Sequence, residues 1–270
     1  MRAIRIVGDN AGPLTGTGTN TWLIPGREPT LVDASEDSDA YADRVAETLE
    51  SAQPGATLER LLVTHAHSDH IGGAGAIVRR WPDVSCEKIP AARDAETGIA
   101  WKPLKDDDIV KAGDGVLWVL HTPGHAPDHA CFLDPHSAVA CSGDLLINGA
   151  TVTIPVSSGG NLRQYLRALR RLLDLQPRQL LPGHGPAIEQ PAALIRGYLG
   201  HRQLREQQIV EALEQESRTR EALVERIYQG LDEALKPAAA ENVLAHLIKL
   251  EEDGRVAQDG DRWTLIPARI

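Results

Sequence analysis

Residues 64–73 read THAHSDHIGG and place His65, His67, Asp69 and His70 within six positions. An apolar run of the kind found in buried strands comes directly before them. An ordinary loop gains little from neighbouring neutral imidazoles, whereas a metal ion needs several ligands close together. Histidine nitrogens and carboxylate oxygens are ligands that zinc and similar divalent ions accept. The stretch therefore predicts part of a metal site on a loop that follows a strand.

Three residues later in the chain have the same setting. His125 in HTPGH, Asp144 in SGDLL and His184 in PGHGP each follow an apolar run and stand beside a glycine. Glycine allows the backbone to come close to a ligand. Strands that end near one rim bring their loops together, so we expect all seven side chains to meet. Seven ligands suit two metal ions, with one aspartate shared between them.

The pattern of the chain changes near residue 200. Before it, short β-rich runs alternate with amphipathic helices such as residues 161–174. After it come three expected helices, over residues 201–217, 219–231 and 237–253. They are followed by a hairpin around Asp259 and Gly260. This order indicates a winged helix, so we predict a metal-binding domain over residues 1–200 and a small domain over residues 201–270.

The composition limits the classes of partner. The 270 residues include 42% hydrophobic and 24% charged residues, as in soluble globular proteins, and carry a formal net charge of −10. This charge argues against DNA and anionic membranes as general partners. We find no signal peptide and no membrane-spanning run, and three cysteines without a CxxC pair indicate packed, reduced thiols in a cytoplasmic protein. The sequence leaves open whether the protein is a monomer or a homodimer.

The motifs also resemble a known family when they are taken in order. GTGTNTWLI, THAHSDHIGG, HTPGH, SGDLL, LLPGHGPAI and HRQLREQQI together resemble the metallo-β-lactamase superfamily. Within it they most resemble the β-lactamase-like protein 2 family, a mitochondrial-type endoribonuclease family with many bacterial relatives. The resemblance covers nearly the whole chain. It implies an α/β fold, an αββα sandwich of two mixed sheets with outer helices, followed by a small winged-helix domain.

The resemblance also implies how the ligands divide. One metal would be bound by His65, His67 and His125. The second would be bound by Asp69, His70 and His184, and Asp144 would bridge the two.

Two divalent ions about 3.5–4 Å apart make hydroxide available near neutral pH. Zinc is the expected metal, with manganese or iron as alternatives. The expected catalytic residues are Asp69, a ligand placed to orient the hydroxide, and Asp144, which joins the ions. Asp33 in TLVDAS matches an aspartate that supports a ligand histidine, and His129 is a second candidate for such support. No serine or cysteine nucleophile is required, and Cys141 is expected to be a core thiol.

The remaining histidines are not expected to belong to the site. His121 precedes Thr-Pro and is expected to be structural. His136, His201 and His246 are expected to be solvated.

The family contains several kinds of hydrolase, and the residues favour some of them. The antibiotic-hydrolysing members have Cys or Ser where Asp144 stands, and the persulfide dioxygenases use a single iron. Ester, thioester or lactone hydrolysis remains, together with cleavage of single-stranded RNA. Both halves of the chain carry more acidic than basic residues, which disfavours a phosphate backbone. The exception is a basic strip on one expected helix, formed by Arg163, Arg167, Arg170 and Arg171.

We therefore expect a metal-dependent hydrolase that acts on a small-molecule acyl substrate. Endoribonuclease activity is the alternative, and a winged-helix nucleic-acid binder without catalysis is the third hypothesis. The segment over residues 148–161 is longer and more polar than the family pattern, so we expect it to shape a substrate pocket. Whether it or His129 contacts substrate is left open by the sequence.

The C-terminal domain is expected to form a wall of the substrate groove rather than to bind DNA. In its third helix, Val243, Leu244, Leu247 and Leu250 face the domain core. Outside that stripe Lys249 is the only basic residue of residues 237–253, so a phosphate backbone would meet negative charge.

Overall fold

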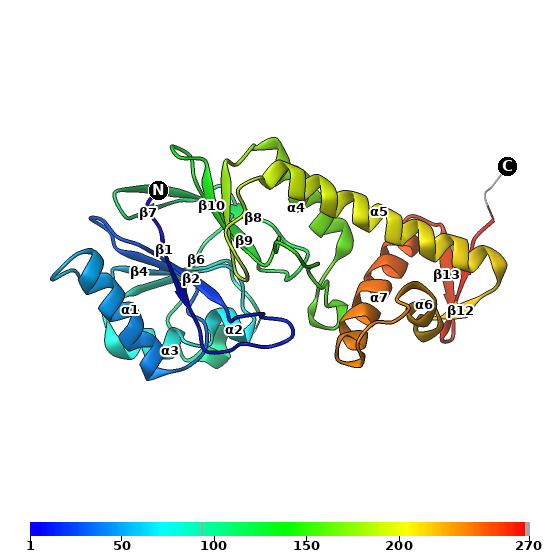
Figure 1. Ribbon diagram of the computed structural model, residues 1–270, viewed down its shortest axis with the longest axis horizontal. Coiled ribbons are helices and arrows are strands. Elements are labelled where there is room, and N and C mark those ends of the chain that lie inside the picture. Colours follow the sequence, from blue (N-terminus) through cyan, green and yellow to red (C-terminus); the bar gives the residue numbers. More distant parts are fainter. Residues whose placement is uncertain (93, 268–270) are drawn as a thin grey trace.

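The computed structural model describes residues 1–92 and 94–267, and its larger part is built on two facing β-sheets (Figure 1). The first sheet has six strands in chain order, antiparallel from β1 to β3 and parallel from β3 to β6. These strands are β1 (Ile4–Val7), β2 (Asn20–Ile24), β3 (Thr30–Val32), β4 (Arg60–Val63), β5 (Ser85–Lys88) and β6 (Lys102–Pro103).

The second sheet has five strands in the order β11-β10-β9-β8-β7. Its β10–β11 pair is parallel and its other pairs are antiparallel. The strands are β7 (Ile109–Ala112), β8 (Gly115–His121), β9 (Ala130–Asp134), β10 (Val139–Gly143) and β11 (Gln179–Pro182). Apolar side chains of both sheets, such as Val32, Leu62, Val119 and Phe132, pack together as one buried cluster between them. Burial of this apolar surface holds the two sheets face to face.

Helices cover the outer faces of both sheets. Helices α1 (Asp39–Ala52) and α3 (Ala74–Arg80) pack on the first sheet, and α4 (Leu162–Asp174) and the first half of α5 (Pro191–Gln215) pack on the second. The caps explain where two of them begin, because Ser38 accepts from Tyr41 N and Asn161 accepts from Gln164 N. The predicted αββα sandwich is confirmed. A one-turn helix, α2 (Ser68–Ile71), lies within the histidine-rich loop.

The C-terminal part is the predicted winged helix, with its own apolar core. That core contains Leu213 of α5 together with Val224, Leu247 and Trp263 from the elements that follow it. Its elements are β12 (Arg218–Thr219), α6 (Arg220–Ile227), α7 (Lys236–Glu252), β13 (Val256–Asp259) and β14 (Arg262–Leu265). The described residues also form three short 3-10 helices, namely η1 (Asp94–Thr97), η2 (Val156–Ser158) and η3 (Glu233–Leu235).

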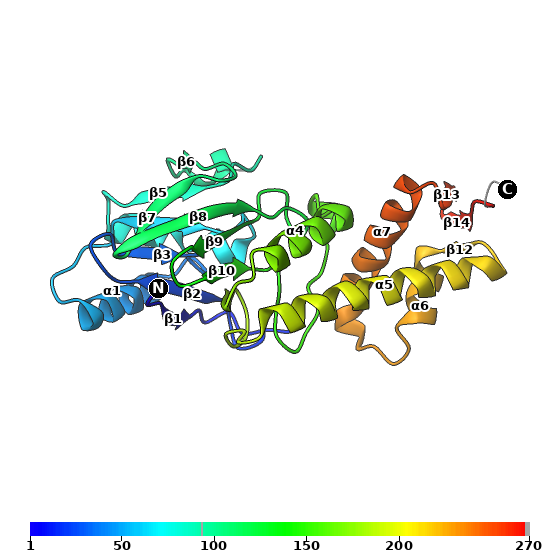
Figure 2. The ribbon, with the colours of Figure 1, turned by 90° about the horizontal axis from the view of Figure 1, so that it is seen from above.

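Helix α5 joins the two parts and is longer than the sequence indicated. It begins at Pro191, ten residues before the expected start, and runs without a break through residue 200 (Figure 2). Pro191 suits the first turn of a helix, whereas Gly197 and Gly200 weaken the helical signal of the segment that follows it. The division at residue 200 therefore falls inside a continuous helix, and it stays a prediction.

The structure corrects the expectation for one histidine. His136 is exposed as expected and His201 is partly exposed, but His246 is only 2% exposed and is therefore not solvated. His246 lies where α7 packs against α5, a contact that is remote in sequence.

Two other expectations concern thiols and membrane spans. Cys86, Cys131 and Cys141 are all free and buried, as predicted. Among the described residues, no helix has the length and apolar character needed to cross a membrane.

Candidate metal centre

The seven predicted ligands lie together, because loops from both sheets meet at one rim of the sandwich. Residues 65–70 follow β4, and His125 lies between β8 and β9. Asp144 follows β10 and His184 follows β11, which are parallel neighbours and so end on the same side. The two sheets are joined at this rim because Ala130 N donates to the Thr64 carbonyl, at 2.8 Å. The sequence separation of up to about 120 residues is therefore bridged by the fold itself.

The first group of candidate ligands consists of three ring nitrogens in mutual contact. His67 Nδ1 lies 3.0 Å from His65 Nε2 and 2.9 Å from His125 Nε2. Zinc–nitrogen bonds of about 2.0–2.1 Å in a tetrahedron place neighbouring nitrogens roughly 3.3 Å apart, close to these distances. The three rings are oriented as the ligands of one ion would be.

The second group consists of Asp69, His70 and His184, whose donor atoms also lie within 4.8 Å of one another. His184 Nε2 is 3.2 Å from Asp69 Oδ2, and His70 Nε2 is 3.6 Å from the same oxygen. Asp144 lies between the two groups. Its Oδ2 is 3.4 Å from His184 Nε2 and 3.8 Å from His125 Nε2. This is the position that a bridging carboxylate requires.

Hydrogen bonds fix which nitrogen of three rings faces the centre. His70 Nδ1 lies 2.8 Å from the Asp33 carboxylate, and His125 Nδ1 lies 2.8 Å from the Thr153 carbonyl. Both oxygens can only accept, so each Nδ1 carries a proton. Thr64 Oγ1 donates its one proton to Asp33 and must accept from His65 Nδ1, at 3.1 Å. When neutral, all three rings therefore direct the lone pair of Nε2 into the centre.

Two buried polar atoms of the centre have no hydrogen-bond partner, and they show whether a cation would fit there. Among the described residues, His70 Nε2 and Asp144 Oδ1 are buried without a hydrogen bond, although they lie only 3.4 Å apart. Buried polar atoms are normally paired, and a nitrogen lone pair beside a carboxylate oxygen needs a positive charge between them. A Cβ on Gly183 would lie 2.6 Å from Asp144 Oδ1 and 2.5 Å from His70 Cε1, so glycine keeps this space open. The residues present fit a divalent ion.

The pKa values of the histidines differ between the two groups. Burial, followed by the charges of neighbouring histidines, lowers the pKa of His65 well below its usual value and that of His67 to about 4. In the second group burial opposes the charge of His184, but Asp144 and Asp69 raise its pKa to about 9. Burial likewise opposes ionisation of Asp69, but His184 and His70 lower its pKa to about 2. The carboxylate of Asp69 is therefore ionised at neutral pH.

Two predicted supporting residues contact the site as expected, and two others were missed. Asp33 holds His70, as described above. His129 is fully buried, and its Nε2 accepts from Asp144 N at 3.1 Å while its Nδ1 faces Thr122 Oγ1 at 2.8 Å. Thr64 and Thr122, which orient these rings, were not singled out because a threonine at a strand end carries no distinctive sequence signal.

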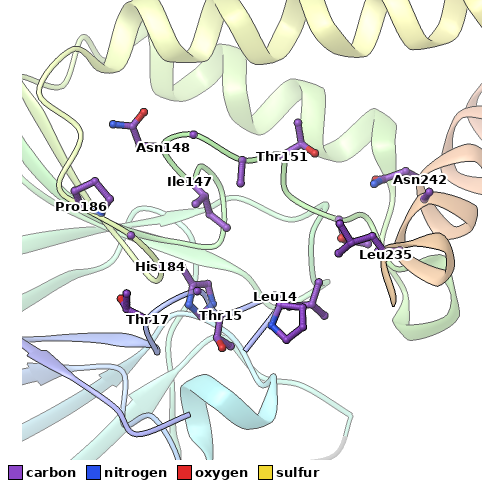
Figure 3. Close-up of a pocket in the computed structure, with 18 of the residues that line it drawn as sticks. Leu14, Thr15, Thr17, Ile147, Asn148, Thr151, His184, Pro186, Leu235 and Asn242 are labelled. Atoms are coloured by element: carbon purple, nitrogen blue, oxygen red, sulfur yellow. The ribbon is translucent and has the colours of Figure 1, made fainter. Parts of the chain in front are cut away.

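A cleft of about 680 Å³ opens beside His184 (Figure 3). Residues 13–17 form one side, and residues 147–153 form another. The winged helix supplies a third side with Tyr228, Leu231, Leu235 and Asn242. The predicted roles of the residue 148–161 segment and of the C-terminal domain as walls agree with this lining.

The comparisons with known proteins agree with the fold and the site. Residues 14–184 match the metallo-beta-lactamase superfamily, and residues 219–263 match the beta-lactamase associated winged helix domain. A beta-lactamase-like protein 2 homolog of Drosophila melanogaster is 34% identical over 274 residues, which is 96% of this chain and 91% of that protein. The chain therefore belongs to the metallo-beta-lactamase superfamily, as its motifs predicted. Its fold and its cluster of metal-binding side chains are those of a metallo-hydrolase.

Two further similarities extend over most of the chain. An atrochrysone carboxyl ACP thioesterase of Cryptosporiopsis sp. (strain 8999) is 29% identical, over 95% of this chain and 81% of that protein. A crystal structure of a metallo-beta-lactamase family protein from Thermus thermophilus has a TM-score of 0.79 and 24% identity, and covers 98% of both chains. The latter similarity concerns the fold alone.

Proposed function

We propose that the protein hydrolyses a small-molecule acyl substrate, a thioester in the first place, with an ester or lactone as close variants. The observation that carries this proposal is the double position of His184. It contacts Asp69 and Asp144 in the candidate metal centre, and it also lines the cleft. A substrate held in the cleft would thus have its reacting bond beside the metal ligands.

Two divalent ions, when bound by the seven residues, supply the Lewis acidity that polarises a carbonyl and activates water near neutral pH. The residues of this chain do the rest. Asp69 keeps a quarter of its side chain exposed, the largest fraction among the carboxylates of the centre, so it can accept a hydrogen bond from an incoming water and orient it. The backbone N–H of Asp144 donates to His129, which holds the backbone of Asp144 beside the centre. Zinc remains the proposed metal, with manganese or iron as alternatives.

The lining of the cleft favours an uncharged acyl group. Among the described residues that line it there is no Asp, Glu or Lys, and Arg5 is the only Arg. Leu14, Leu231 and Leu235 give the cleft apolar surface. The thioesterase named above is a relative whose substrate is an acyl group on a carrier protein, which supports the same class of bond.

RNA is disfavoured by the same lining and by the ion pairs of α4. A phosphate backbone is usually met by several Lys or Arg side chains. Arg163 instead pairs with Glu252 and Asp253, and Arg171 pairs with Asp106 and Asp107. The expected basic strip is therefore half neutralised. Endoribonuclease activity stays the alternative.

The test is to assay metal-loaded protein side by side on acyl thioesters, lactones and short single-stranded RNA. We expect thioester hydrolysis that a chelator abolishes and that Asp69→Ala or Asp144→Ala lowers by orders of magnitude. Asp114→Ala, an exposed carboxylate remote from the centre, is the matched control and should keep full activity. Cleavage of RNA without acyl hydrolysis would replace this proposal with the alternative.

Thiol chemistry is tested separately. Burial raises the pKa of the Cys131 thiol to about 12 and that of Cys141 well above its usual value, so neither thiol ionises near neutral pH. Cys131→Ala and Cys141→Ala should retain metal-dependent turnover. Loss of turnover in folded Cys141→Ala would show that a cysteine, not a metal-activated water, attacks the substrate.

A further experiment tests whether Leu231 and Leu235 contact the acyl group. Leu231→Ser and Leu235→Ser should lower kcat/KM for a long-chain acyl thioester by roughly tenfold, about the loss of two buried methylene contacts, and change that for an acetyl thioester little. Leu204→Ser, which alters an exposed leucine of α5 outside the cleft, is the control. Equal losses for both chain lengths would mean that the wall does not contact the acyl group.

A further inference from the structure

The winged helix holds the segment at residues 152–157 by direct hydrogen bonds. Asn242 of α7 accepts from Ile154 N at 3.1 Å through its side-chain oxygen, and this contact is buried. Glu241, the preceding residue of α7, accepts from Ser157 N at 3.0 Å. A segment that forms one side of the cleft is thus fixed by residues nearly 90 positions later in the chain.

Arg202 of α5 holds the same segment from a second direction. Its side chain is 2% exposed, and it donates from Nη1 to Asn242 Oδ1 at 3.1 Å and from Nη2 to the carbonyl of Val152. The guanidinium carbon lies 5.4 Å from the centre of the Tyr165 ring. No carboxylate among the described residues forms an ion pair with Arg202. A buried cation without an anionic partner is stabilised mainly by hydrogen bonds to neutral acceptors. Loss of either of these two bonds would therefore destabilise the folded protein strongly.

The residue between these two anchor points contacts the candidate metal centre. Asn242 holds Ile154 and Arg202 holds Val152, and the carbonyl of Thr153 accepts from His125 Nδ1 at 2.8 Å. This bond places the proton of the ring on Nδ1 and turns Nε2 toward His67, 2.9 Å away. The orientation of His125 therefore depends on where the backbone places one carbonyl oxygen.

We propose that Asn242 and Arg202 are positioning residues for the metal centre. By fixing residues 152 and 154 they hold the Thr153 carbonyl against His125, so the C-terminal domain controls one ligand of the first group. The inference rests on the metal centre proposed above, but not on the identity of the substrate. It gives the winged helix a role in metal binding that is separate from its role as a wall of the cleft.

The test is a metal titration, because a merely structural contact between domains would not alter the affinity of one ion. Asn242→Leu removes the acceptor of both Ile154 N and Arg202. We expect it to weaken the binding of one of two Co²⁺ ions by about tenfold, the lower end of the effect known for groups that orient a ligand. The visible spectrum of bound Co²⁺ should change with it. Asn242→Asp keeps an acceptor oxygen and should bind Co²⁺ as the unaltered protein does.

The matched control is Arg163→Gln. Arg163 of α4 pairs with Glu252 and Asp253 of α7, so this variant loosens the same interface between the two parts without touching residues 152–154. We expect its Co²⁺ affinity to be unchanged. If Asn242→Leu does not fold, Arg202→Met provides the same test, because it removes the bond to Val152 and the buried charge together.

A readout on the metal-free protein completes the experiment. The ring N–H of His125, observed by NMR in protein with ¹⁵N-labelled histidine, should exchange with water faster in Asn242→Leu than in Arg163→Gln. Unchanged exchange and unchanged Co²⁺ affinity in folded Asn242→Leu and Arg202→Met would overturn the proposal. Failure of the unaltered protein to bind two ions would overturn both this proposal and the metal centre. Failure to hydrolyse acyl substrates, with two ions bound, would overturn only the proposed function.

Discussion

Nδ1 of His70 lies 2.8 Å from Oδ2 of Asp33, and both side chains are almost fully buried. The same carboxylate accepts from the backbone and the hydroxyl of Thr64, at 2.7 and 2.9 Å. Burial opposes a charge on His70, but Asp33 and Asp144 together raise its pKa well above the usual value. One aspartate outside the ligand set therefore orients the loop of the second group and one of its rings.

The first prediction concerns this aspartate. Asp33→Asn keeps a similar shape but removes the negative charge that accepts the hydrogen bond from His70 Nδ1. The His70 ring is then held less firmly, and its Nε2 binds a metal ion more weakly. We expect the affinity for one of the two ions to fall by about 10–100-fold. Competition with a chelator measures it. Asp37→Asn, which changes an exposed carboxylate paired with Arg79, is the control, and equal affinities in the two variants would contradict the prediction.

The second prediction concerns the space beside Gly183. Gly183→Ala would place a methyl group within 2.6 Å of atoms of His70 and Asp144, so the ligands must move apart. We expect loss of one bound ion and of most hydrolytic activity, with the fold retained. Metal content by elemental analysis checks it. Gly197→Ala, where an added Cβ meets nothing within 4 Å, should instead stabilise α5 by roughly 0.5–1 kcal/mol.

The third prediction concerns acid stability. His246 is buried with both ring nitrogens unpaired among the described residues, and burial, then the charges of Arg202 and Lys249, lowers its pKa to about 3. His201 and Arg205 add further positive charge. The unfolded chain takes up a proton on this ring near pH 6.5, whereas the folded chain does so only near pH 3. The free energy of unfolding is therefore highest above pH 6.5, and it decreases as the pH falls from 6.5 toward 3.

His246→Leu removes this group and should flatten the fall of unfolding free energy between about pH 7 and pH 4. Urea unfolding at several pH values measures the slope. His136→Leu changes an exposed histidine and is the control. A slope that is the same in His246→Leu and in the unaltered protein would show that other groups cause the acid sensitivity.

The fourth prediction concerns DNA. Lys249 is committed to Glu206 and Asp253, each at 2.7 Å, and the buried residues of α7, such as Val243, Leu247 and Leu250, face the domain core. We therefore expect no binding of duplex DNA at low salt, because the phosphate backbone would meet little free positive charge. Fluorescence anisotropy of a labelled duplex checks this. Tight binding that weakens steeply with salt would contradict it.

The sequence predicted the cluster of seven side chains from local signals, and it predicted the sandwich from the order of strands and helices together with the family resemblance of its motifs. His65, His67, Asp69 and His70 stand beside one another, and each later ligand is marked by a glycine and a preceding strand. The exposure of His246 was predicted wrongly, since its burial arises from packing between α5 and α7 that no local pattern records. For the same reason the contacts of Arg202 and Asn242 could not be predicted from the sequence. Each is an ordinary polar residue on a helix until the chain folds.

The walls of the cleft come from opposite ends of the chain, with Leu14 on one side and Leu235 and Asn242 on another. A ribosome that has passed residue 184 has already produced all seven proposed metal ligands. The cleft becomes complete only when α7 has emerged, more than fifty residues later. During synthesis there is thus an interval in which the growing chain holds every ligand but lacks one wall of the cleft. In that interval the Thr153 carbonyl also has no Asn242 to keep it against His125.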